Sequence, residues 1–426
     1  MSPSMITLIV LCAMLICFIT RVIPAGATAL LGCLIMVWTG VIDLQTAFAS
    51  FTGNIVLLLI GVMIIGAAFV EVGNADDFGN LIIKWFSGSE KKLIICLTLI
   101  VTIVSAFLSN TASVAIFLPI IDAIARASNG KIKRKNLYMP VAIGSVIGGN
   151  AILFGSTPQL ASQAILEKST VAGVRALGLF DLLPGTVILA AVIIIFYLVA
   201  GCNLQNKWFD FEENEVVAIE KHEINQSKLK KIMVYVSYLV FVALFISGLL
   251  SIGVSAIVGA LICVVSKCIT EKKALKSVGW STIILLGGLL GFSEAVSASN
   301  LCPEIVSFVL GLFEGNTLPW FTGYVILVVV AVVLTSVVSN TAVATILTPI
   351  AIEMAVQTGG NPMLFVIAII FASNISFCTP IATPPIMMTA GVGYRFSDYF
   401  KLGGLLSAVL TLVVIFVIPL IYNIIL

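Results

Sequence analysis

Charge is scarce in this chain, and what is missing excludes several classes of protein. Only 10% of the 426 residues are charged, there is a single histidine, and the net charge is +2. So small a net charge gives no reason to expect the basic surface that binds a nucleic acid. The nine cysteines form no Cys-x-x-Cys pair, so neither a zinc site nor a disulfide framework is predicted. An enzyme is not predicted either, because His222 lies in a polar stretch without a nucleophile or metal cluster.

Apolar residues, in contrast, make up 60% of the chain and fall into long runs. No soluble core needs so much apolar sequence, so an all-α polytopic membrane protein is predicted. The first run has neither a basic start nor a clear cleavage site, and we expect a retained helix rather than a signal peptide. Two shorter segments, 78–86 and 301–312, keep helical spacing and are predicted to be interfacial helices. The runs occupy residues 5–20, 27–42, 54–72, 93–108, 112–125, 137–166, 181–200, 232–250, 254–266, 279–298, 319–338, 342–356, 363–391 and 402–426.

One polar motif occurs twice within this apolar sequence. Residues 109–120 read SNTASVAIFLPI and residues 339–350 read SNTAVATILTPI. A Ser-Asn-Thr triplet in such a place needs polar partners, because little water is available. The turn at 108–112 has no charge, Gly or Pro, unlike an aqueous loop. A hairpin and a pair of full crossings both return the chain to the same side, but this composition favours a hairpin tip buried at mid-membrane.

The basic residues predict an orientation. We let the hairpins 91–127 and 319–356 return to their own sides and every other run cross once. All but Lys168 and Arg175 of the 22 Lys and Arg residues then fall on one side. The positive-inside rule makes that side cytoplasmic and places both termini outside.

The same topology divides the chain into two halves. Residues 1–201 and 232–426 each make an odd number of crossings, so they are predicted to be inverted repeats. Residues 202–231, which contain His222, are predicted to form a cytoplasmic linker. Both halves contain a hairpin followed by a long run.

The long runs, 137–166 and 363–391, exceed one span and are interrupted. The interruptions lie at 155–159, which reads Gly-Ser-Thr-Pro-Gln, and at 379–385, which contains Thr-Pro and Thr-Pro-Pro. Proline removes a helix hydrogen bond and frees carbonyl groups. Broken helices at corresponding places of two repeats indicate a transport site, with a simple proline kink as the alternative.

The spacing of hydroxyls suggests what the turns bind. Ser105 precedes Ser109 by four residues, as Thr335 precedes Ser339, so each pair shares a helix face. Carbonyls at a helix end, together with hydroxyls and amides, suit Na⁺, while the N-terminus of the next helix suits an anion. The alternative is that these hydroxyls bond back to their own helix. No Lys or Arg falls inside an apolar run, so bound cations would have to balance an anionic substrate.

The paired Ser-Asn-Thr turns, the Gly-Ser-x-Pro break and the Ala-Thr-Pro-Pro break resemble the divalent-anion/sodium symporter family of the ion transporter superfamily, over nearly the whole chain. The resemblance implies a homodimeric, multi-pass elevator transporter of the cell (inner) membrane, coupled to Na⁺ and without an organic cofactor. The implied sodium ligands are Ser105, Ser109, Asn110 and Gly155 at one site and Thr335, Val338, Asn340 and Ala382 at the other. The expected substrate-binding residues are Asn110, Thr111, Ser156, Thr157, Ser339, Asn340, Thr341, Thr383 and Pro384.

Two departures from the family pattern are expected to touch the substrate. Residues 156–159 read Ser-Thr-Pro-Gln where the family usually has Ser-Pro-Pro-Asn, and Ile386 stands where the family has Asn. The predicted function is sodium-coupled transport of small divalent anions, with di- or tricarboxylates first. The alternatives are an anion exchanger, or a cation/proton antiporter or arsenite-type permease. For the last two, Asp122, Glu294 or Glu353 would matter more, whereas we expect structural pairing for Asp122 and Glu353.

Overall fold

The chain folds into helices. The computed structural model describes residues 1–73, 89–128, 131–214, 227–313 and 318–425, and no strand occurs within these ranges. Seven helical segments within them are long and apolar enough to cross a bilayer, which confirms a multi-pass, all-α membrane protein. These segments are Pro3–Thr20, Leu44–Glu71, Leu183–Trp208, Lys228–Ile246, Trp280–Ala298, Asn340–Thr358 and Phe396–Ile424.

The first half of the chain begins with three long apolar helices, α1, α2 and α4, and the five-residue α3 before α4; a hairpin and an interrupted helix follow. A 3₁₀ segment joins α3 to α4, and a π-helical turn joins α10 to α11. The helices are α1 (Pro3–Thr20), α2 (Ala25–Trp38), α3 (Leu44–Phe48), α4 (Asn54–Glu71), α6 (Glu90–Phe107), α7 (Asn110–Ala127), α8 (Arg134–Gly148), α9 (Thr157–Leu166), α10 (Leu183–Phe196) and α11 (Cys202–Trp208).

The second half repeats this order. Its second helix has 14 residues, as in the first half, and its hairpin is again followed by an interrupted helix. A helix, α16, is present at 301–311, where an interfacial helix was expected. The one expected at 78–86 and His222 lie outside the described residues. The helices are α12 (Lys228–Ile246), α13 (Ile252–Val265), α14 (Glu271–Ser277), α15 (Trp280–Ala298), α16 (Leu301–Gly311), α17 (Trp320–Thr335), α18 (Asn340–Thr358), α19 (Pro362–Asn374), α20 (Pro384–Met387), α21 (Phe396–Asp398) and α22 (Gly404–Ile425).

Short polar or flexible residues set the helix ends. Asn361 caps α19 by accepting a hydrogen bond from the N–H of Met363 at 2.9 Å, and Pro362 occupies the first helical position. Gly359 ends α18 with a φ of +71°, a conformation that favours glycine. A sharp turn between α18 and α19 follows.

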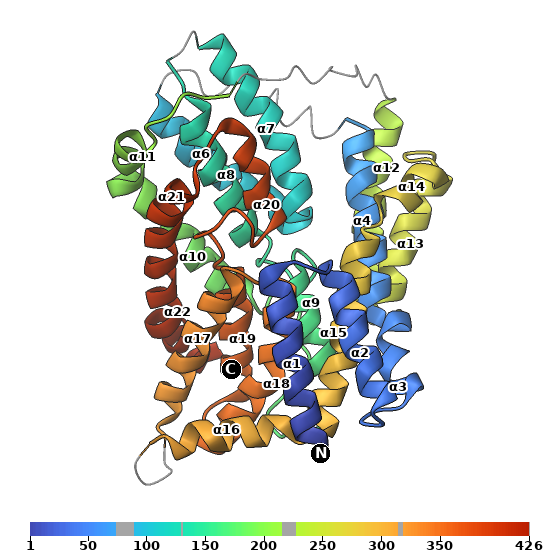
Figure 1. Cartoon of the computed structure of the whole chain (residues 1–426). Helices are drawn as coiled ribbons and strands as arrows, with labels where there is room; N and C mark the ends of the chain where they lie inside the picture. Colours follow the sequence, from blue (N-terminus) through green and yellow to red (C-terminus); the bar gives the residue numbers. More distant parts are fainter. Residues whose placement is uncertain (74–88, 129–130, 215–226, 314–317, 426) are drawn as a thin grey trace.

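The helices pack in two groups, and each group takes helices from both halves. The first group contains α1 to α4 and α12 to α15, and the second contains α6 to α11 and α17 to α22. Figure 1 shows α4, α12 and α13 on the right and α8, α10 and α22 on the left. Helix α15 of the first group packs against α18 and α9 of the second. In the same view the hairpin of α6 and α7 occupies the upper half of the molecule, and that of α17 and α18 the lower half.

The interruptions of the two long runs are wider than the sequence predicted. Helix α8 already ends at Gly148, and the non-helical segment covers residues 149–156; in the second half it covers residues 375–383. The last helical residue, Gly148, lies against α6. A Cβ at Gly148 would lie 2.1 Å from the carbonyl oxygen of Thr102 in α6, so a side chain there would push the two helices apart. Of the expected break at 155–159, only residues 155 and 156 are non-helical, because Thr157 to Gln159 form the first turn of α9.

Acidic residues within the apolar sequence have structural partners. Asp122 accepts a hydrogen bond from the hydroxyl of Tyr138 at 2.7 Å and lies 3.6 Å from Arg134. Arg134 also contacts Glu213, at 3.0 Å, so the start of the linker is tied to α8. Glu353 accepts from the amide of Gln357 at 2.6 Å. The structural pairing expected for Asp122 and Glu353 is confirmed.

Two further acids form ion pairs. Glu71 of α4 lies 2.5 Å from Lys273 of α14, within the first group of helices. Glu294 of α15 lies 2.5 Å from Lys168, which follows α9 of the second group. Both pairs are partly exposed, so each contributes little to stability.

We expect Gly148→Ala to destabilise the protein. The new Cβ has no space between α6 and α8, and overpacking of this kind costs about 1–3 kcal/mol. The melting temperature of the purified protein in detergent measures the effect. Gly311→Ala is the matched control, since a Cβ at Gly311 has no heavy atom within 4 Å. Equal melting temperatures for the two variants would contradict the prediction.

Candidate functional site

The two Ser-Asn-Thr turns start two helices in the same way. The Oγ of Ser109 accepts a hydrogen bond from the N–H of Ala112 at 3.3 Å, and Ser339 does the same for Ala342 at 3.3 Å. Serine is a preferred N-cap because its hydroxyl pairs an N–H that lacks a helical partner. The first N–H groups of α7 and α18 remain available to a ligand, since they too lack helical acceptors.

A hydroxyl network lies behind the first turn. Ser105 donates to Oδ1 of Asn110 at 3.0 Å and lies 3.1 Å from the hydroxyl of Ser145 in α8. Ser145 donates to the carbonyl of Asn110 at 2.7 Å. Gly149 allows this arrangement, because a Cβ there would lie 2.0 Å from Oδ1 of Asn110. The turn is therefore held against the interrupted helix of its own half.

A related network lies behind the second turn. The hydroxyl of Thr335 shares its one proton between Oδ1 of Asn340, at 2.9 Å, and the carbonyl oxygen of Ser373, at 2.5 Å. Nδ2 of Asn340 approaches Oδ1 of Asn374 at 3.5 Å, and the same oxygen accepts from Ser156 at 3.3 Å. Asn374 thus joins the turn of the second half to the interrupted segment of the first. The hydroxyls of Ser105 and Thr335 reach across to other segments, and the alternative that they bond to their own helix is wrong.

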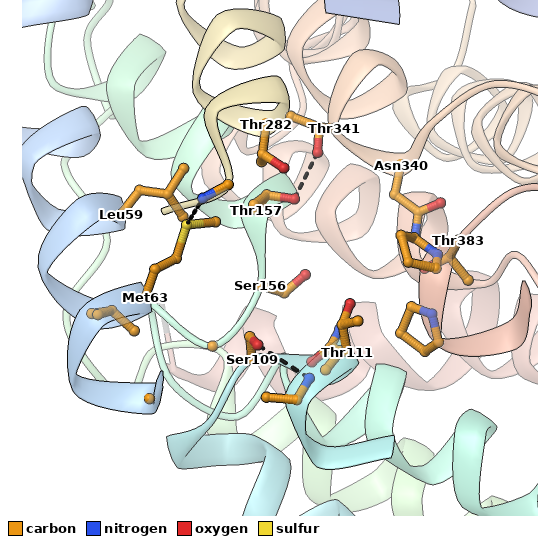
Figure 2. Close-up of a pocket in the computed structure, with 18 of the residues that line it drawn as sticks. Leu59, Met63, Ser109, Thr111, Ser156, Thr157, Thr282, Asn340, Thr341 and Thr383 are labelled. Carbon is orange, nitrogen blue, oxygen red and sulfur yellow. Dashed lines mark hydrogen bonds between the residues drawn. The ribbon is translucent and has the colours of Figure 1, made fainter. Parts of the chain in front are cut away.

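Both turns face one cavity of about 550 Å³. All nine residues expected to bind substrate line it, as do Asn374 and Pro158. Figure 2 shows Ser109 and Thr111 from one turn, Asn340 and Thr341 from the other, and Ser156 between them. The hydroxyls of Thr157 and Thr341 lie 2.6 Å apart. The polar side of the cavity therefore combines residues from both halves of the chain.

The opposite wall comes from the first group of helices and is mostly apolar. Its lining residues from α4 include Leu59 and Met63, which Figure 2 shows across the cavity from the Ser-Asn-Thr turns. The hydroxyl-bearing Thr282 of α15 completes this wall. Ala67 and Ser277 line both this cavity and a smaller hollow that Lys273 and Lys276 flank. The cavity thus extends toward the end of the molecule that carries these lysines.

The expected sodium ligands divide into two sets by position. Five of them line the cavity: Ser109, Asn110, Gly155, Asn340 and Ala382. Ser105, Thr335 and Val338 are buried behind it, with at most 1% of their surface exposed. Hydroxyl, amide and backbone carbonyl oxygens thus surround each turn, a donor set that suits a hard monovalent cation.

The electrostatics of the site come from helix ends. None of the described residues that line the cavity is acidic, basic or a histidine. The helices α7, α18 and α9 begin at the cavity with Asn110, Asn340 and Thr157, and the four-residue α20 begins there with Pro384. Each helix N-terminus carries a partial positive charge of about one half of an elementary charge. The arrangement therefore favours an anion beside the turns.

The structure corrects the expected place of two substituted residues. Gln159 does not line the cavity; its Nε2 donates to the carbonyls of Gly149, at 2.8 Å, and Ile152, at 2.6 Å. It therefore bonds to backbone carbonyls of the non-helical segment 149–156 and not to the cavity. Ile386 is fully buried and does not line the cavity either. Of the departures from the family pattern, only Thr157 lies where a substrate can touch it.

Sequence reasoning missed Ser145, Asn374 and Thr282. The first two are polar residues inside apolar runs, and that property was a usable signal. Thr282 is also a polar residue inside an apolar run, 279–298, but its place on the cavity depends on how α15 packs against the second group.

The fold and the site define a membrane transporter: a multi-pass helical protein with an interior polar cavity reached by two hairpins. The sequence profile described as "Citrate transporter" matches residues 15–368 and 315–425. The chain belongs to this citrate transporter family, and the resemblance to the divalent-anion/sodium symporters is confirmed.

Individual relatives agree with this assignment. The chain is 23% identical to the sodium-dependent dicarboxylate transporter SdcS of Staphylococcus saprophyticus, over 94% of this chain and 84% of that protein. It is 23% identical to the sodium-dependent high-affinity dicarboxylate transporter 3 of Caenorhabditis elegans, over 93% and 80%. An uncharacterized transporter of Synechocystis, sll0640, is 29% identical over 49% of this chain, which spans only 34% of that protein.

Solved structures share the fold. The Alcanivorax borkumensis YdaH transporter aligns with a TM-score of 0.63 at 12% identity, over 89% of both chains. MtrF of Neisseria gonorrhoeae, from a class of antimetabolite efflux pumps, aligns with a TM-score of 0.56 at 14% identity, over 90% of this chain and 83% of that one. At these identities the likeness shows the fold alone.

We expect Thr335→Val to destabilise the protein more than Thr345→Val. Both hydroxyls are buried, but that of Thr345 bonds only to its own helix, at the carbonyl of Thr341. Loss of the Thr335 hydroxyl leaves Oδ1 of Asn340 and the carbonyl of Ser373 short of a donor, at a cost of about 1–3 kcal/mol. Thermal unfolding in detergent compares the two variants. A Thr345→Val variant as unstable as Thr335→Val would contradict the role given to the network.

Proposed function

We propose that this protein is a sodium-coupled secondary transporter of small divalent anions, with di- or tricarboxylates as the first class to test. The observation that carries the proposal is that both Ser-Asn-Thr turns face one cavity. There, helix N-termini for an anion lie beside hydroxyl, amide and carbonyl oxygens for a cation. Two relatives named as sodium-dependent dicarboxylate transporters support the same substrate class.

The lack of a basic residue on the cavity gives coupling a physical reason. A dianion that leaves water for an apolar interior needs compensating charge, and partial charges at helix ends do not balance two full ones. Sodium ions bound behind the turns, near Ser105 and Thr335, would supply it. Cations would bind first and complete the anion site, so that neither ion crosses alone. An anion exchanger would use the same site, but its anion would bind without a cation binding first.

The architecture supports an elevator mechanism. The two halves repeat the same order of helices, and the two hairpins lie in opposite halves of the molecule in Figure 1, as inverted repeats would place them. The first group of helices would be the scaffold and the second the transport domain that slides past it. The mostly apolar wall that α4 and α15 give the cavity suits such a sliding contact. In a homodimer, contacts between the two scaffolds would keep them fixed while each transport domain moves.

The distribution of basic residues supports an orientation. Both termini lie in the lower half of Figure 1, away from α14 with its lysines. If the lysine-rich end is cytoplasmic, as the positive-inside rule requires, the cavity opens to the cytoplasm and both termini are outside. The conformation would then be inward-facing.

A cation/proton antiporter or arsenite-type permease fits the geometry less well. Such a protein needs a titratable group in its transport site. Asp122, Glu294 and Glu353 all have partners away from the cavity.

In proteoliposomes we expect an inward sodium gradient to drive uptake of a radiolabelled C4-dicarboxylate or citrate. Asn110→Ala and Asn340→Ala should each reduce uptake by about tenfold or more, the effect of one lost hydrogen bond to a charged group. Asn203→Ala, an exposed asparagine on α11, is the control for the substitution itself.

Two results would contradict the proposal. One is the absence of sodium-dependent uptake or exchange of any dicarboxylate, tricarboxylate or oxyanion. The other is loss of transport in Glu353→Gln or Glu294→Gln with Asn110→Ala and Asn340→Ala still active, which would favour the antiporter.

The order of binding predicts a second result. A transported anion should raise the melting temperature in Na⁺ but not in K⁺, because the anion site is complete only after sodium binds. At an anion concentration of 100 times Kd, linkage adds about 2.7 kcal/mol of stability. A panel of anions in each salt measures this by thermal unfolding. Equal stabilisation in K⁺ would rule out obligatory sodium coupling.

A further inference from the structure

Arg21 ends the first helix in an unusual conformation. It follows α1 with φ +56° and ψ +23°, in the left-handed region, and its N–H donates to the carbonyl of Cys17. Residues other than Gly, Asn and Asp adopt this region at a steric cost, so the surrounding structure must favour it. Lys267, at the end of α13, is the other basic residue with a positive φ among the described residues.

The side chain of Arg21 reaches the second interrupted segment. Its Nη2 donates to the carbonyl oxygen of Ile381 at 2.7 Å, across 360 residues of sequence. This hydrogen bond joins α1 of the first group of helices to residues 375–383 of the second group. The positive-inside count treats Arg21 as a residue of a loop on the lysine-rich side; in the structure its exposed guanidinium bonds to a carbonyl that directly precedes two cavity-lining residues.

The acceptor is next to two residues of the site. Ala382 and Thr383 follow Ile381 directly, are buried, and line the cavity. The segment is non-helical and contains Pro380, so few backbone hydrogen bonds hold it in place. Another bond to the segment comes from within the second group, where Thr379 donates to the carbonyl of Ser336 at 2.6 Å. Arg21 is therefore an anchor from the opposite group of helices.

We propose that Arg21 is a positioning residue for the second cation site. By holding the carbonyl of Ile381, it sets the backbone of Ala382 and Thr383 in the conformation that binds sodium and substrate. It does so only while the two groups of helices have the relative placement described here, because the donor and the acceptor belong to different groups. The inference rests on the proposed function, because it assumes that the second group of helices slides past the first during transport.

If Arg21 has this role, the affinity of the protein for sodium differs between the two faces of the membrane. With the cavity open toward the lysine-rich side, the bond is made and orders the site. After the second group moves, the bond is broken and Arg21 no longer contributes. Loss of the side chain therefore weakens sodium binding on one face and leaves the other unchanged, whereas damage to the fold would affect both.

The test compares sodium activation in right-side-out and inside-out vesicles. We expect Arg21→Gln and Arg21→Asn to raise the half-activating sodium concentration by about threefold or more on the lysine-rich side, as for a partly exposed interaction, and not on the other. Asparagine also tolerates the left-handed backbone, so Arg21→Asn separates the side chain from backbone strain. Arg21→Lys, which keeps a charged donor, should retain more affinity than Arg21→Gln. Lys267→Gln, with the same charge loss and a similar backbone, is the matched control and should behave as wild type.

Hydrogen–deuterium exchange tests the same bond without transport. In detergent, the amides of Ile381, Ala382 and Thr383 should exchange several-fold faster in Arg21→Gln than in wild type, while Lys267→Gln leaves them unchanged. Exchange within α22, away from the bond, reports whether the variant is folded.

The outcomes separate the two proposals. Wild type that carries no anion would overturn the proposed function, and exchange at 381–383 would still decide whether Arg21 holds the segment. Active wild type with unchanged sodium activation in Arg21→Gln on both faces would overturn the role of Arg21 alone. An equal change in half-activating sodium concentration on both faces would also overturn the role of Arg21. Unchanged amide exchange at 381–383 in Arg21→Gln would do the same.

Discussion

The structure depends on one constraint: helix ends placed inside an apolar protein must find partners for their backbone groups. At the Ser-Asn-Thr turns, Ser109 and Ser339 cap the helices from within, and the networks behind them pair the amides of Asn110 and Asn340. What remains unpaired is the first N–H groups and nearby oxygens, and these face a shared cavity. The same requirement that makes such turns costly also creates a site for ions.

The two turns are alike, but their surroundings are not, and this difference gives the cavity its shape. Behind Asn110 stands Ser145, and α8 ends in glycine, where α6 approaches closely. Behind Asn340 stands α19, which ends in Asn374 and reaches across to Ser156 of the other half. A symmetric pair of turns thus becomes an asymmetric pocket, in which one substrate orientation can be preferred.

Much of the fold and of the candidate site followed from local sequence. Apolar runs gave the helices to within a few residues, because the bilayer fixes their length and composition. The repeated triplet and the prolines located residues that line the cavity. Gln159 and Ile386 were wrongly placed there, because sequence spacing does not say whether a side chain near a break faces the cavity or the carbonyls behind it. The close contact of α8 with α6 at Gly148 was not predicted for a similar reason, since sequence spacing does not say which helix a glycine faces.

By itself the sequence determined the class of protein, the two hairpin tips and the absence of Lys and Arg from the apolar runs. These follow from composition and local chemistry, which every residue carries with it. Tertiary structure alone decided which distant groups meet: Thr157 with Thr341, Ser156 with Asn374, and Arg21 with the carbonyl of Ile381. Contacts across hundreds of residues depend on how helices pack, and packing is a property of the whole chain.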